Sequence, residues 1–384
     1  MIAKIEPFEV MEILARAKEL ERAGEDVIHL EIGEPDFDIP TKAKLESIKA
    51  IKEGFTHYTE SKGIPELREA IAEYLSSNLD LHLSPDKVLI TGGVSLGLLY
   101  SLSTILNKGD NVIVPDPSYP CYPNIIRFVG GRVKTVELEE DFSLNIEKLK
   151  ENIDGKTRAI ILNTPSNPTG TYLSSRELKG ITEIAEDNDV YVISDEIYSG
   201  LVYDRKRSPS ILEQDYEKVI MLDGFSKLYA MTGMRIGYAV STAEIIEDMD
   251  KIQQNLYICP SSISQRAALA SLECEKDVEY MKRKFNERRK LVYRKLKRIS
   301  GVKVIEPKGA YYIFPDIRKI CTDSNKFAEK LLEKEKVAVT PGKAFGKNGE
   351  GHIRISYSTS IEKLEEGLNR IENFISQLSS QTVL

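Results

Sequence analysis

Short apolar runs alternate with helix-like segments between about residues 85 and 275, and this alternation limits the possible folds more than any other feature. The runs lie at residues 87–90, 111–115, 158–163, 190–196, 218–222 and 236–240. They are apolar at successive positions, which is typical of strands buried on both faces. The segments between them carry apolar residues at helical spacing, for example Leu98, Leu102 and Ile105. The pattern predicts an α/β fold with a mostly parallel sheet between helices.

The pattern changes after about residue 275. A long charged helix is expected first, then strand-like runs at 310–314, 336–340 and 352–356 with helices at 325–334 and 361–377. This order predicts a smaller α+β domain. The basic stretch from Met281 to Arg298 is either the solvated face of the long helix or an anion-binding surface.

The composition excludes several functional classes. The net charge of −7, from 53 basic and 60 acidic residues, argues against a general nucleic-acid binder. The four cysteines are scattered, with no histidine at metal-ligand spacing, so we expect free thiols and no metal site. No segment approaches the roughly 20 apolar residues of a membrane span, and the N-terminus lacks a signal-like apolar core. We therefore expect a cytoplasmic protein without a membrane partner.

Glycine and tyrosine follow two of the predicted strands. Gly92 and Gly93 come after the first run and before a helix, where backbone amides can approach a phosphate or simply form a tight turn. Tyr119 and Tyr122 lie in a proline-rich loop after the second run. Each could stack on a planar ring or pack within the loop. Ligands of parallel sheets bind at these carboxyl ends of the strands.

Amide and acidic residues follow the next two strands. Asn163 and Asn167 follow the third run, where they could form turns or donate to an anionic oxygen. Asp195, with Tyr198 shortly after it, ends the fourth run. A carboxylate at the end of an apolar strand needs a partner. A protonated ring nitrogen is suitable, and a helix cap or a salt bridge is the alternative.

Lys227 follows the fifth run, next to Ser226 and eight residues before Arg235. A lysine there either reaches water along the surface or forms a Schiff base with an aldehyde. Together the strand ends supply phosphate donors, an aromatic face, an amide, a carboxylate and a lysine. That combination matches pyridoxal phosphate, which has an aldehyde, a phosphate, a phenolic oxygen and a pyridinium nitrogen.

These motifs carry a family resemblance. The chain resembles the fold-type I pyridoxal-phosphate aminotransferases, in particular the aspartate and aromatic aminotransferase group of classes I and II and its archaeal aspartate aminotransferase-like members. The resemblance runs nearly end to end. Its motifs are LEIGEPDF (30–37), HYTESKGIPELREAIAEYL (57–75), NTPSNPTG (163–170), ISDEIY (193–198), GFSKLYAMTGMRIGY (224–238), KGAYYIFP (308–315) and RISYS (354–358).

The resemblance implies a role for each strand-end residue. Lys227 would bind the cofactor aldehyde and then move the substrate proton, and Asp195 would pair with the ring nitrogen. Tyr198 and Asn167 would contact the phenolic oxygen, and Tyr119 would stack on the ring. The phosphate would be held by Ser226, Arg235, Gly92, Gly93 and the amide of Val94.

Three further residues take roles from the resemblance. Arg354 would bind the substrate α-carboxylate through two hydrogen bonds, and Gly33 would pass its backbone close to the substrate. Tyr58 would reach the cofactor phosphate of a neighbouring subunit, which implies a homodimer. The resemblance also implies a fold-type I architecture with a seven-stranded-type sheet. A large cofactor-binding domain is expected at 40–275, and a small domain at 1–39 and 276–384.

The resemblance implies a ping-pong aminotransferase that moves an α-amino group from an L-amino acid to a 2-oxo acid such as 2-oxoglutarate. Aspartate is the first expectation for the donor, with aromatic amino acids and alanine as alternatives. The helix after Gly93 has no lysine for a distal carboxylate, and Tyr257 could favour aromatic side chains. The alternative activity is a pyridoxal-phosphate lyase, such as a carbon–sulfur lyase, on the same fold.

Overall fold

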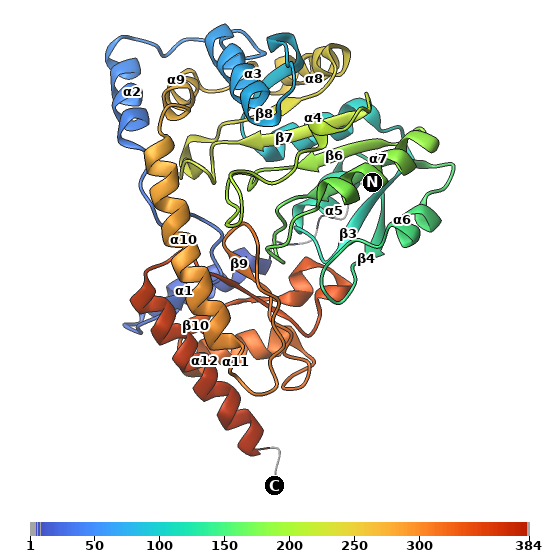
Figure 1. Cartoon of the computed structure of the whole chain (residues 1–384). Helices are drawn as coiled ribbons and strands as arrows, with labels where there is room; N and C mark the ends of the chain where they lie inside the picture. Colours follow the sequence, from blue (N-terminus) through green and yellow to red (C-terminus); the bar gives the residue numbers. More distant parts are fainter. Residues whose placement is uncertain (1–4, 6, 8, 382–384) are drawn as a thin grey trace.

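The structure is a computed structural model that describes residues 5, 7 and 9–381. The predicted segment 1–39 therefore begins partly outside the described residues. The central feature of the structure is a seven-stranded sheet (Figure 1). In spatial order its strands are β2 (Val88–Thr91), β8 (Gly237–Val240), β7 (Val219–Gly224), β6 (Tyr191–Asp195), β5 (Thr157–Asn163), β3 (Asn111–Asp116) and β4 (Arg132–Glu137).

All neighbouring strands in this sheet are parallel except at β8, which is antiparallel to β2 and β7. The predicted α/β fold with a mostly parallel sheet is therefore confirmed. The strand predicted from each of the six apolar runs is present. One strand was missed: β4 lies at the sheet edge and is largely solvent-accessible, so it lacks the apolar run that identifies a buried strand.

The helices associated with this sheet continue the predicted alternation. They are α2 (Thr41–Lys52), α3 (Pro65–Leu79), α4 (Val94–Ile105), α5 (Cys121–Phe128), α6 (Ile146–Asn152), α7 (Ser175–Asp187), α8 (Ala243–Leu256) and α9 (Ser262–Ser271), with the 3₁₀ turns η1 (Pro85–Lys87), η2 (Ile211–Glu213) and η3 (Thr232–Met234). Side-chain hydrogen bonds to the backbone cap the starts of several of these helices. Ser174 and Glu177 form a capping box at the start of α7, for example.

The sheet is buried on both faces because its strands are apolar at successive positions. Ile113 of β3 belongs to one core cluster, whereas its neighbours Val112 and Val114 belong to a second cluster on the opposite face. Helices packed on both faces hold the strands in place. The carboxyl ends of β5, β6 and β7 therefore form a rigid edge.

The rest of the chain forms two small sheets and four helices. These are β1 (Ile28–His29) paired with β10 (Val337–Ala338), the antiparallel set β11 (Thr340–Pro341), β12 (Ile353–Ser356) and β9 (Tyr312–Ile313), the helices α1 (Glu9–Arg22), α10 (Glu275–Leu296), α11 (Ser324–Glu335) and α12 (Ile361–Gln381), and the turns η4 (Gly342–Phe345) and η5 (Lys347–Gly349).

Segments far apart in the sequence meet in this second part. The β1–β10 pair joins residues 28–29 to residues 337–338, and α1 packs against α11, where Arg16 pairs with Glu333 (Figure 1). The long helix α10 packs through Met281, Phe285 and Val292, so its basic residues mostly face outward. The division into domains at 40–275 and at 1–39 with 276–384 stays a prediction.

Close backbone packing between β8 and the turn before α4 gives a stability test. A methyl group on Gly237 would lie 3.0 Å from the amide nitrogen of Val94 and 3.1 Å from the carbonyl carbon of Gly93. We expect Gly237→Ala to lower the free energy of unfolding by about 1–3 kcal/mol, because backbone must move. Chemical denaturation of the apo-protein measures this. Gly155→Ala is the control, since a methyl group there meets open space; equal midpoints for both variants would contradict the packing argument.

Candidate active site

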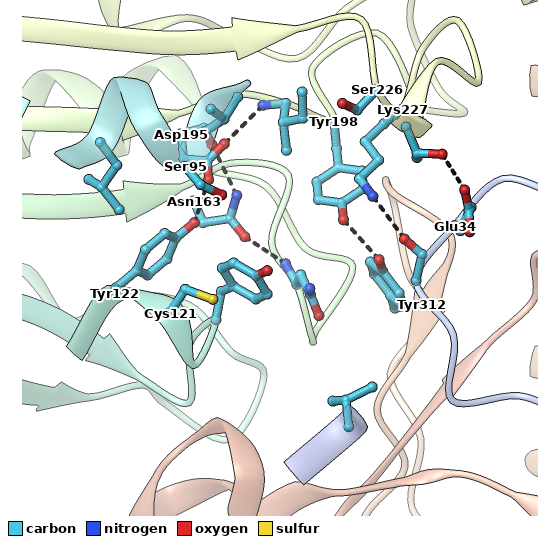
Figure 2. Close-up of a pocket in the computed structure, with 18 of the residues that line it drawn as sticks. Glu34, Ser95, Cys121, Tyr122, Asn163, Asp195, Tyr198, Ser226, Lys227 and Tyr312 are labelled. Atoms are coloured by element: carbon cyan, nitrogen blue, oxygen red, sulfur yellow. Dashed lines mark hydrogen bonds between the residues drawn. The ribbon is translucent and has the colours of Figure 1, made fainter. Parts of the chain in front are cut away.

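A cavity of about 410 Å³ lies where the carboxyl ends of β5 and β6 and the segment after β7 approach the second part of the chain (Figure 2). The predicted site residues that line it are Gly33, Val94, Tyr119, Asn167, Asp195, Tyr198, Ser226, Lys227, Arg235 and Arg354. Residues from 33 to 354 thus meet in one place. Gly92, Gly93 and Tyr58, which were also predicted, are not among the lining residues.

Asp195 is buried at the end of β6, and its charge is held by directed hydrogen bonds. The Tyr122 hydroxyl donates to Oδ2 at 2.7 Å, and the amide of Ile197 donates to Oδ1 at 3.2 Å. Burial raises the pKa of Asp195 to about 6, whereas the Tyr122 hydrogen bond opposes this rise. The group is therefore an anion near neutral pH and faces the cavity.

A chain of hydrogen bonds runs from Asn163, at the end of β5, through Asn167 to the guanidinium of Arg354. Asn163 donates to the backbone oxygen of Asp195 at 3.0 Å and accepts from the amide of Asn167 at 2.7 Å. The side-chain oxygen of Asn167 in turn accepts from Arg354 Nη1 at 2.9 Å. Asn163 therefore holds the turn in which Asn167 faces the cavity.

Lys227 lies three residues after the end of β7 and points into the cavity (Figure 2). Its Nζ donates to the backbone oxygen of Gly33 at 2.8 Å. Burial, assisted by the nearby charges of Arg235 and Arg354, lowers the pKa of Lys227 to about 8, although the Glu34 carboxylate opposes this. A lysine with this pKa is partly neutral near neutral pH and can act as a base or a nucleophile.

The first turn of α4 and Arg235 form an anion pocket. The helix begins at Val94, and the preceding Gly93 has φ +100° and provides no side-chain cap, so the helix N-terminus is open to a ligand. A methyl group on Gly93 would lie 2.9 Å from Arg235 Nη2, so glycine is required for this close approach. Gly92 lies just outside, against Leu96 and Tyr257.

Arg354 of β12 is 3% exposed and its guanidinium lies between two aromatic rings. Its Cζ is 4.6 Å from the ring centre of Tyr312 and 5.0 Å from that of Phe345. It also donates to the backbone oxygen of Glu31. Its Nε is buried without a hydrogen-bond partner in the protein, and the Arg354 side chain lines the cavity.

Two tyrosine hydroxyls meet on one wall of the cavity. Tyr198 and Tyr312 form a hydrogen bond of 2.8 Å, and their rings are nearly perpendicular (Figure 2). Tyr312 also limits Gly33, where a methyl group would lie 2.4 Å from the Tyr312 hydroxyl. The backbone of Gly33 can approach the cavity only because no side chain is present.

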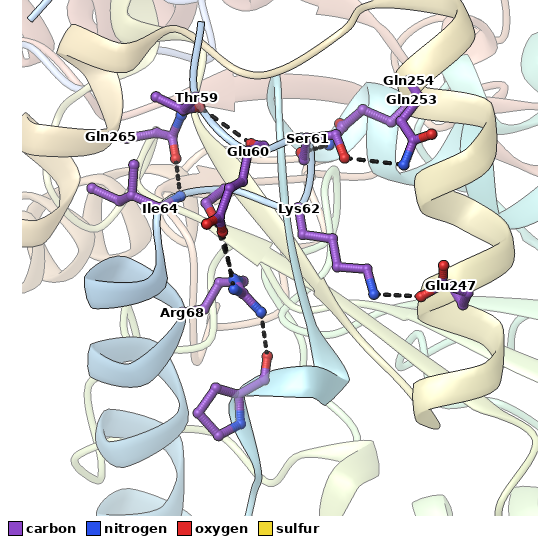
Figure 3. A network of polar contacts seen from close by, with 12 residues as sticks. Thr59, Glu60, Ser61, Lys62, Ile64, Arg68, Glu247, Gln253, Gln254 and Gln265 are labelled. Atoms are coloured by element: carbon purple, nitrogen blue, oxygen red, sulfur yellow. Dashed lines mark hydrogen bonds and ion pairs between the residues drawn. The ribbon is translucent and has the colours of Figure 1, made fainter.

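Tyr58 lies outside this cavity, on a loop that is held from both sides. Its side chain is 79% exposed. Gln253 donates to the backbone oxygens of Ser61 and Ile90, and Gln265 donates to the Thr59 hydroxyl at 3.0 Å (Figure 3).

The sequence analysis missed several residues of the site. The Tyr122–Asp195 hydrogen bond was not foreseen, because Tyr122 lies in α5 rather than in an open loop; its position three residues after Tyr119, one helical turn, was the available signal. Tyr312 was within a quoted motif without a role. Helix α1 contributes Val10, Met11 and Leu14 to the cavity, and no local motif marks them.

The arrangement combines a buried carboxylate, a lysine of lowered pKa, an anion pocket and a second buried guanidinium. This set can hold an anionic cofactor at one end and a substrate carboxylate at the other, with a base between them. Among residues 9–381 no cluster of three or more His, Cys, Asp or Glu side chains is arranged for a metal ion. Within the same described part, no helix is long and apolar enough to span a bilayer.

Comparisons with known proteins agree with this chemistry. The family model for aminotransferase class I and II matches residues 25–371. The (5-formylfuran-3-yl)methyl phosphate transaminase of Methanocaldococcus jannaschii is 48% identical over 98% of this chain and 99% of its own. The aspartate aminotransferase of Pyrococcus horikoshii is 42% identical over 94% of this chain and 93% of its own.

A solved structure from Methanococcus jannaschii, described as similar in its active site to kynurenine aminotransferases, is 48% identical to this chain. It superposes with a TM-score of 0.90 and covers 97% of this chain and 98% of its own. The match extends over both the seven-stranded sheet and the segments that carry Gly33 and Arg354. The chain belongs to the class I and II aminotransferases, which are pyridoxal-phosphate enzymes that act on amino acids and oxo acids.

Proposed function

We propose that this aminotransferase takes the amino group of an L-amino acid with an uncharged, apolar or aromatic side chain. A 2-oxo acid is the proposed acceptor, and one without a second carboxylate suits the cavity better than 2-oxoglutarate, because donor and acceptor occupy the same site in turn. The wall formed by Val10, Met11 and Leu14 carries this proposal, because it offers an apolar surface for the donor side chain.

The charges of the cavity support the same choice over aspartate. Among the described lining residues the cations are Lys227, Arg235 and Arg354. Each has a proposed role in holding the cofactor or the α-carboxylate, which leaves none in this chain for a second carboxylate. Burying an unpaired carboxylate is costly, so aspartate is a poorer donor unless a neighbouring subunit supplies a cation.

The residues present fit pyridoxal phosphate. The open N-terminus of α4, with Ser226 and Arg235, suits its phosphate, and Asp195 suits its ring nitrogen. We assign Tyr198 and Asn167 to its phenolic oxygen and Tyr119 to its ring face. When bound, pyridoxal phosphate supplies an aldehyde that takes up the amino group and a ring that withdraws electrons from the substrate α-carbon.

We propose that Lys227 and Arg354 act directly on the substrate. Arg354, whose side chain lines the cavity, binds the α-carboxylate with its guanidinium and so orients the α-carbon. Lys227 Nζ removes the α-proton and returns it at a different carbon, and its lowered pKa provides the neutral amine. Asp195 stays ionised with the help of Tyr122, which preserves its attraction for a protonated nitrogen.

The proposal includes a homodimer, a division into two domains and a cytoplasmic location. The exposure of Tyr58 on its fixed loop supports the dimer, in which Tyr58 would reach the partner's cofactor phosphate. The long helix α10 begins directly after Cys274. This start supports a large domain at 40–275 and a small domain at 1–39 and 276–384. The cytoplasmic location is based on the sequence composition.

A test of the donor uses the cofactor-loaded protein with one amino acid and no oxo acid. We expect L-tyrosine to react at a concentration at least about tenfold lower than L-aspartate, because aspartate buries an unpaired carboxylate. Absorbance lost between about 360 and 430 nm and gained near about 330 nm marks amino transfer.

In Leu14→Lys, which adds a cation to the apolar wall, the difference between the required concentrations of L-tyrosine and L-aspartate should shrink. A lower requirement for L-aspartate would refute the apolar donor, and pyruvate with ammonia released from a donor would favour the lyase.

A second candidate acceptor comes from the relative that is a furan aldehyde phosphate transaminase. An aldehyde can accept an amino group as an oxo acid does, and it becomes a primary amine. The aminated enzyme should therefore be mixed with 2-oxoglutarate and, separately, with a phosphorylated aromatic aldehyde. Faster recovery of the starting spectrum with the aldehyde would replace the 2-oxo acid as the proposed acceptor.

Stability of the apo-protein should report the burial of Lys227. Its folded pKa of about 8 lies below the ordinary lysine pKa of 10.5, so the charged form is penalised fully below pH 8. The penalty fades as the pH rises from 8 to above 10.5. We expect Lys227→Met to stabilise the apo-protein by about 1–3 kcal/mol at pH 7, and less at pH 10. Thermal midpoints measure this. Exposed Lys156→Met is the control, and a gain that does not depend on pH would point to packing instead.

Mixed dimers test whether Tyr58 serves the partner's site. Tyr58→Ala and Lys227→Ala subunits are co-expressed, and both homodimers are expected to be impaired. A mixed dimer has one site with both native residues only if Tyr58 acts across the interface, so about a quarter of native activity should return. The Lys227→Ala and Asp195→Ala pair is the control, because both residues belong to the same site. Equal recovery in both mixtures would place Tyr58 in its own subunit's site or in none.

A further inference from the structure

A second group of buried charges lies at the ends of β6 and β7, next to Asp195 in the chain. Arg207, in the segment between β6 and η2, has a side chain only 7% exposed. Its Nη2 donates to Asp223 Oδ2 at 3.0 Å and lies 3.6 Å from Glu196 Oε2. Asp223 is on β7 and Glu196 follows β6, so one guanidinium connects two adjacent strand ends.

The group contains one positive charge and two carboxylates. Asp223 also accepts from the Ser199 hydroxyl and the Gly224 amide, and Glu196 accepts from the Ile211 amide. These neutral donors orient the carboxylates but add no compensating charge. Glu196 Oε2 and Arg207 Nε are buried without hydrogen-bond partners. The balance of charge within the group therefore depends on Arg207.

The group is close enough to act on the reaction site. Glu196 directly follows Asp195 in the chain, and Leu222, the residue before Asp223, is paired with Asp195 in the β6–β7 register. The negative charge of Asp223 raises the pKa of Asp195. Asp223 is one residue beyond this pair and both carboxylates are buried, so any loss of compensation at Asp223 would weaken the ionisation of Asp195 through a poorly solvated interior.

We propose that Arg207 is a positioning residue of the active site, which balances the buried charges of Asp223 and Glu196 and thereby keeps Asp195 ionised for the cofactor ring nitrogen. This inference rests on the proposed role of Asp195. Arg207 does not line the cavity, so it acts through its neighbours and touches neither cofactor nor substrate.

Other titratable groups also surround these residues. Tyr122 of α5, Asp223 of β7 and Lys227 act on Asp195. The groups that act on Arg207 are Asp223, Glu196, Tyr74 of α3 and Tyr238 of β8, and Tyr229 responds to its charge. Burial raises the pKa of Tyr229 and of Tyr238, which keeps both phenols neutral near pH 7. The response to Arg207 is therefore carried by the carboxylates.

The test measures binding of pyridoxamine 5'-phosphate, which has the ring nitrogen and the phosphate but no aldehyde to react with Lys227. Its dissociation constant is measured against pH for the native apo-protein, Arg207→Gln and Arg207→Gln/Asp223→Asn. Binding should weaken as the pH falls through the pKa of Asp195, which is about 6. In Arg207→Gln we expect this midpoint to rise by about one unit, with about tenfold weaker binding between the two midpoints.

The double variant separates charge balance from packing. It removes both charges of the pair but keeps side chains that can hydrogen-bond, so we expect the native midpoint to return. Arg207→Lys, which keeps the charge, should stay near the native value. Arg205→Gln is the matched control, because it removes a positive charge from an exposed position in the same segment. Its midpoint should equal that of the native protein.

Each outcome decides whether Arg207 balances charge or only packs. An unchanged midpoint in Arg207→Gln, or a shift that Asp223→Asn does not reverse, overturns the proposal and leaves Arg207 as a packing residue. A single variant that fails to fold while the double variant folds and binds normally supports charge balance, and failure of both overturns it. Asp195→Asn is measured in parallel: if it binds pyridoxamine 5'-phosphate as the native protein does, the proposed role of Asp195 fails, which is a separate result.

Discussion

The cost of removing charged groups from water is the constraint on which this structure depends. Asp195 and Lys227 face one cavity, and burial shifts the pKa of both groups toward neutrality. The fold offsets the cost for Asp195 with the Tyr122 hydroxyl and a backbone amide, and it leaves the lysine partly uncompensated. One group is therefore kept as an anion, whereas the other is close to the neutral form that a base requires.

This division is possible because the carboxyl ends of parallel strands lie side by side. Apolar residues on both faces of β5, β6 and β7 fix the strands between two core clusters, so polar groups at their ends have little freedom. Arg354 reaches the same cavity from the antiparallel β12, and its contact with Asn167 connects the second part of the chain to the sheet. Rigid packing thus replaces water as the environment of each charge.

The sequence predicted the residues that face the cavity better than the residues that hold them in place. The buried strands and their terminal residues were predictable because each strand is an uninterrupted apolar run followed by a polar residue. The edge strand β4 was not, since it is largely solvent-accessible and lacks such a run. Residues that act through others, such as Tyr122 and Arg207, were also not predictable. Their roles arise from contacts across 73 residues or between adjacent strands, and a linear pattern does not encode such contacts.

The charged residues of the cavity and much of its apolar wall belong to different parts of the fold, and relatives with different names share this fold. The charged residues of the cavity come mainly from strand ends, whereas much of the apolar wall comes from α1, far away in the sequence. Substitutions in α1 can change the side-chain pocket without moving Lys227 or Asp195, because the helix is not part of the sheet that holds them. Relatives named for aspartate and for a furan aldehyde phosphate are 42% and 48% identical to this chain, respectively. If α1 sets the donor preference as proposed, selectivity and the chemistry held by the sheet can change independently in this chain.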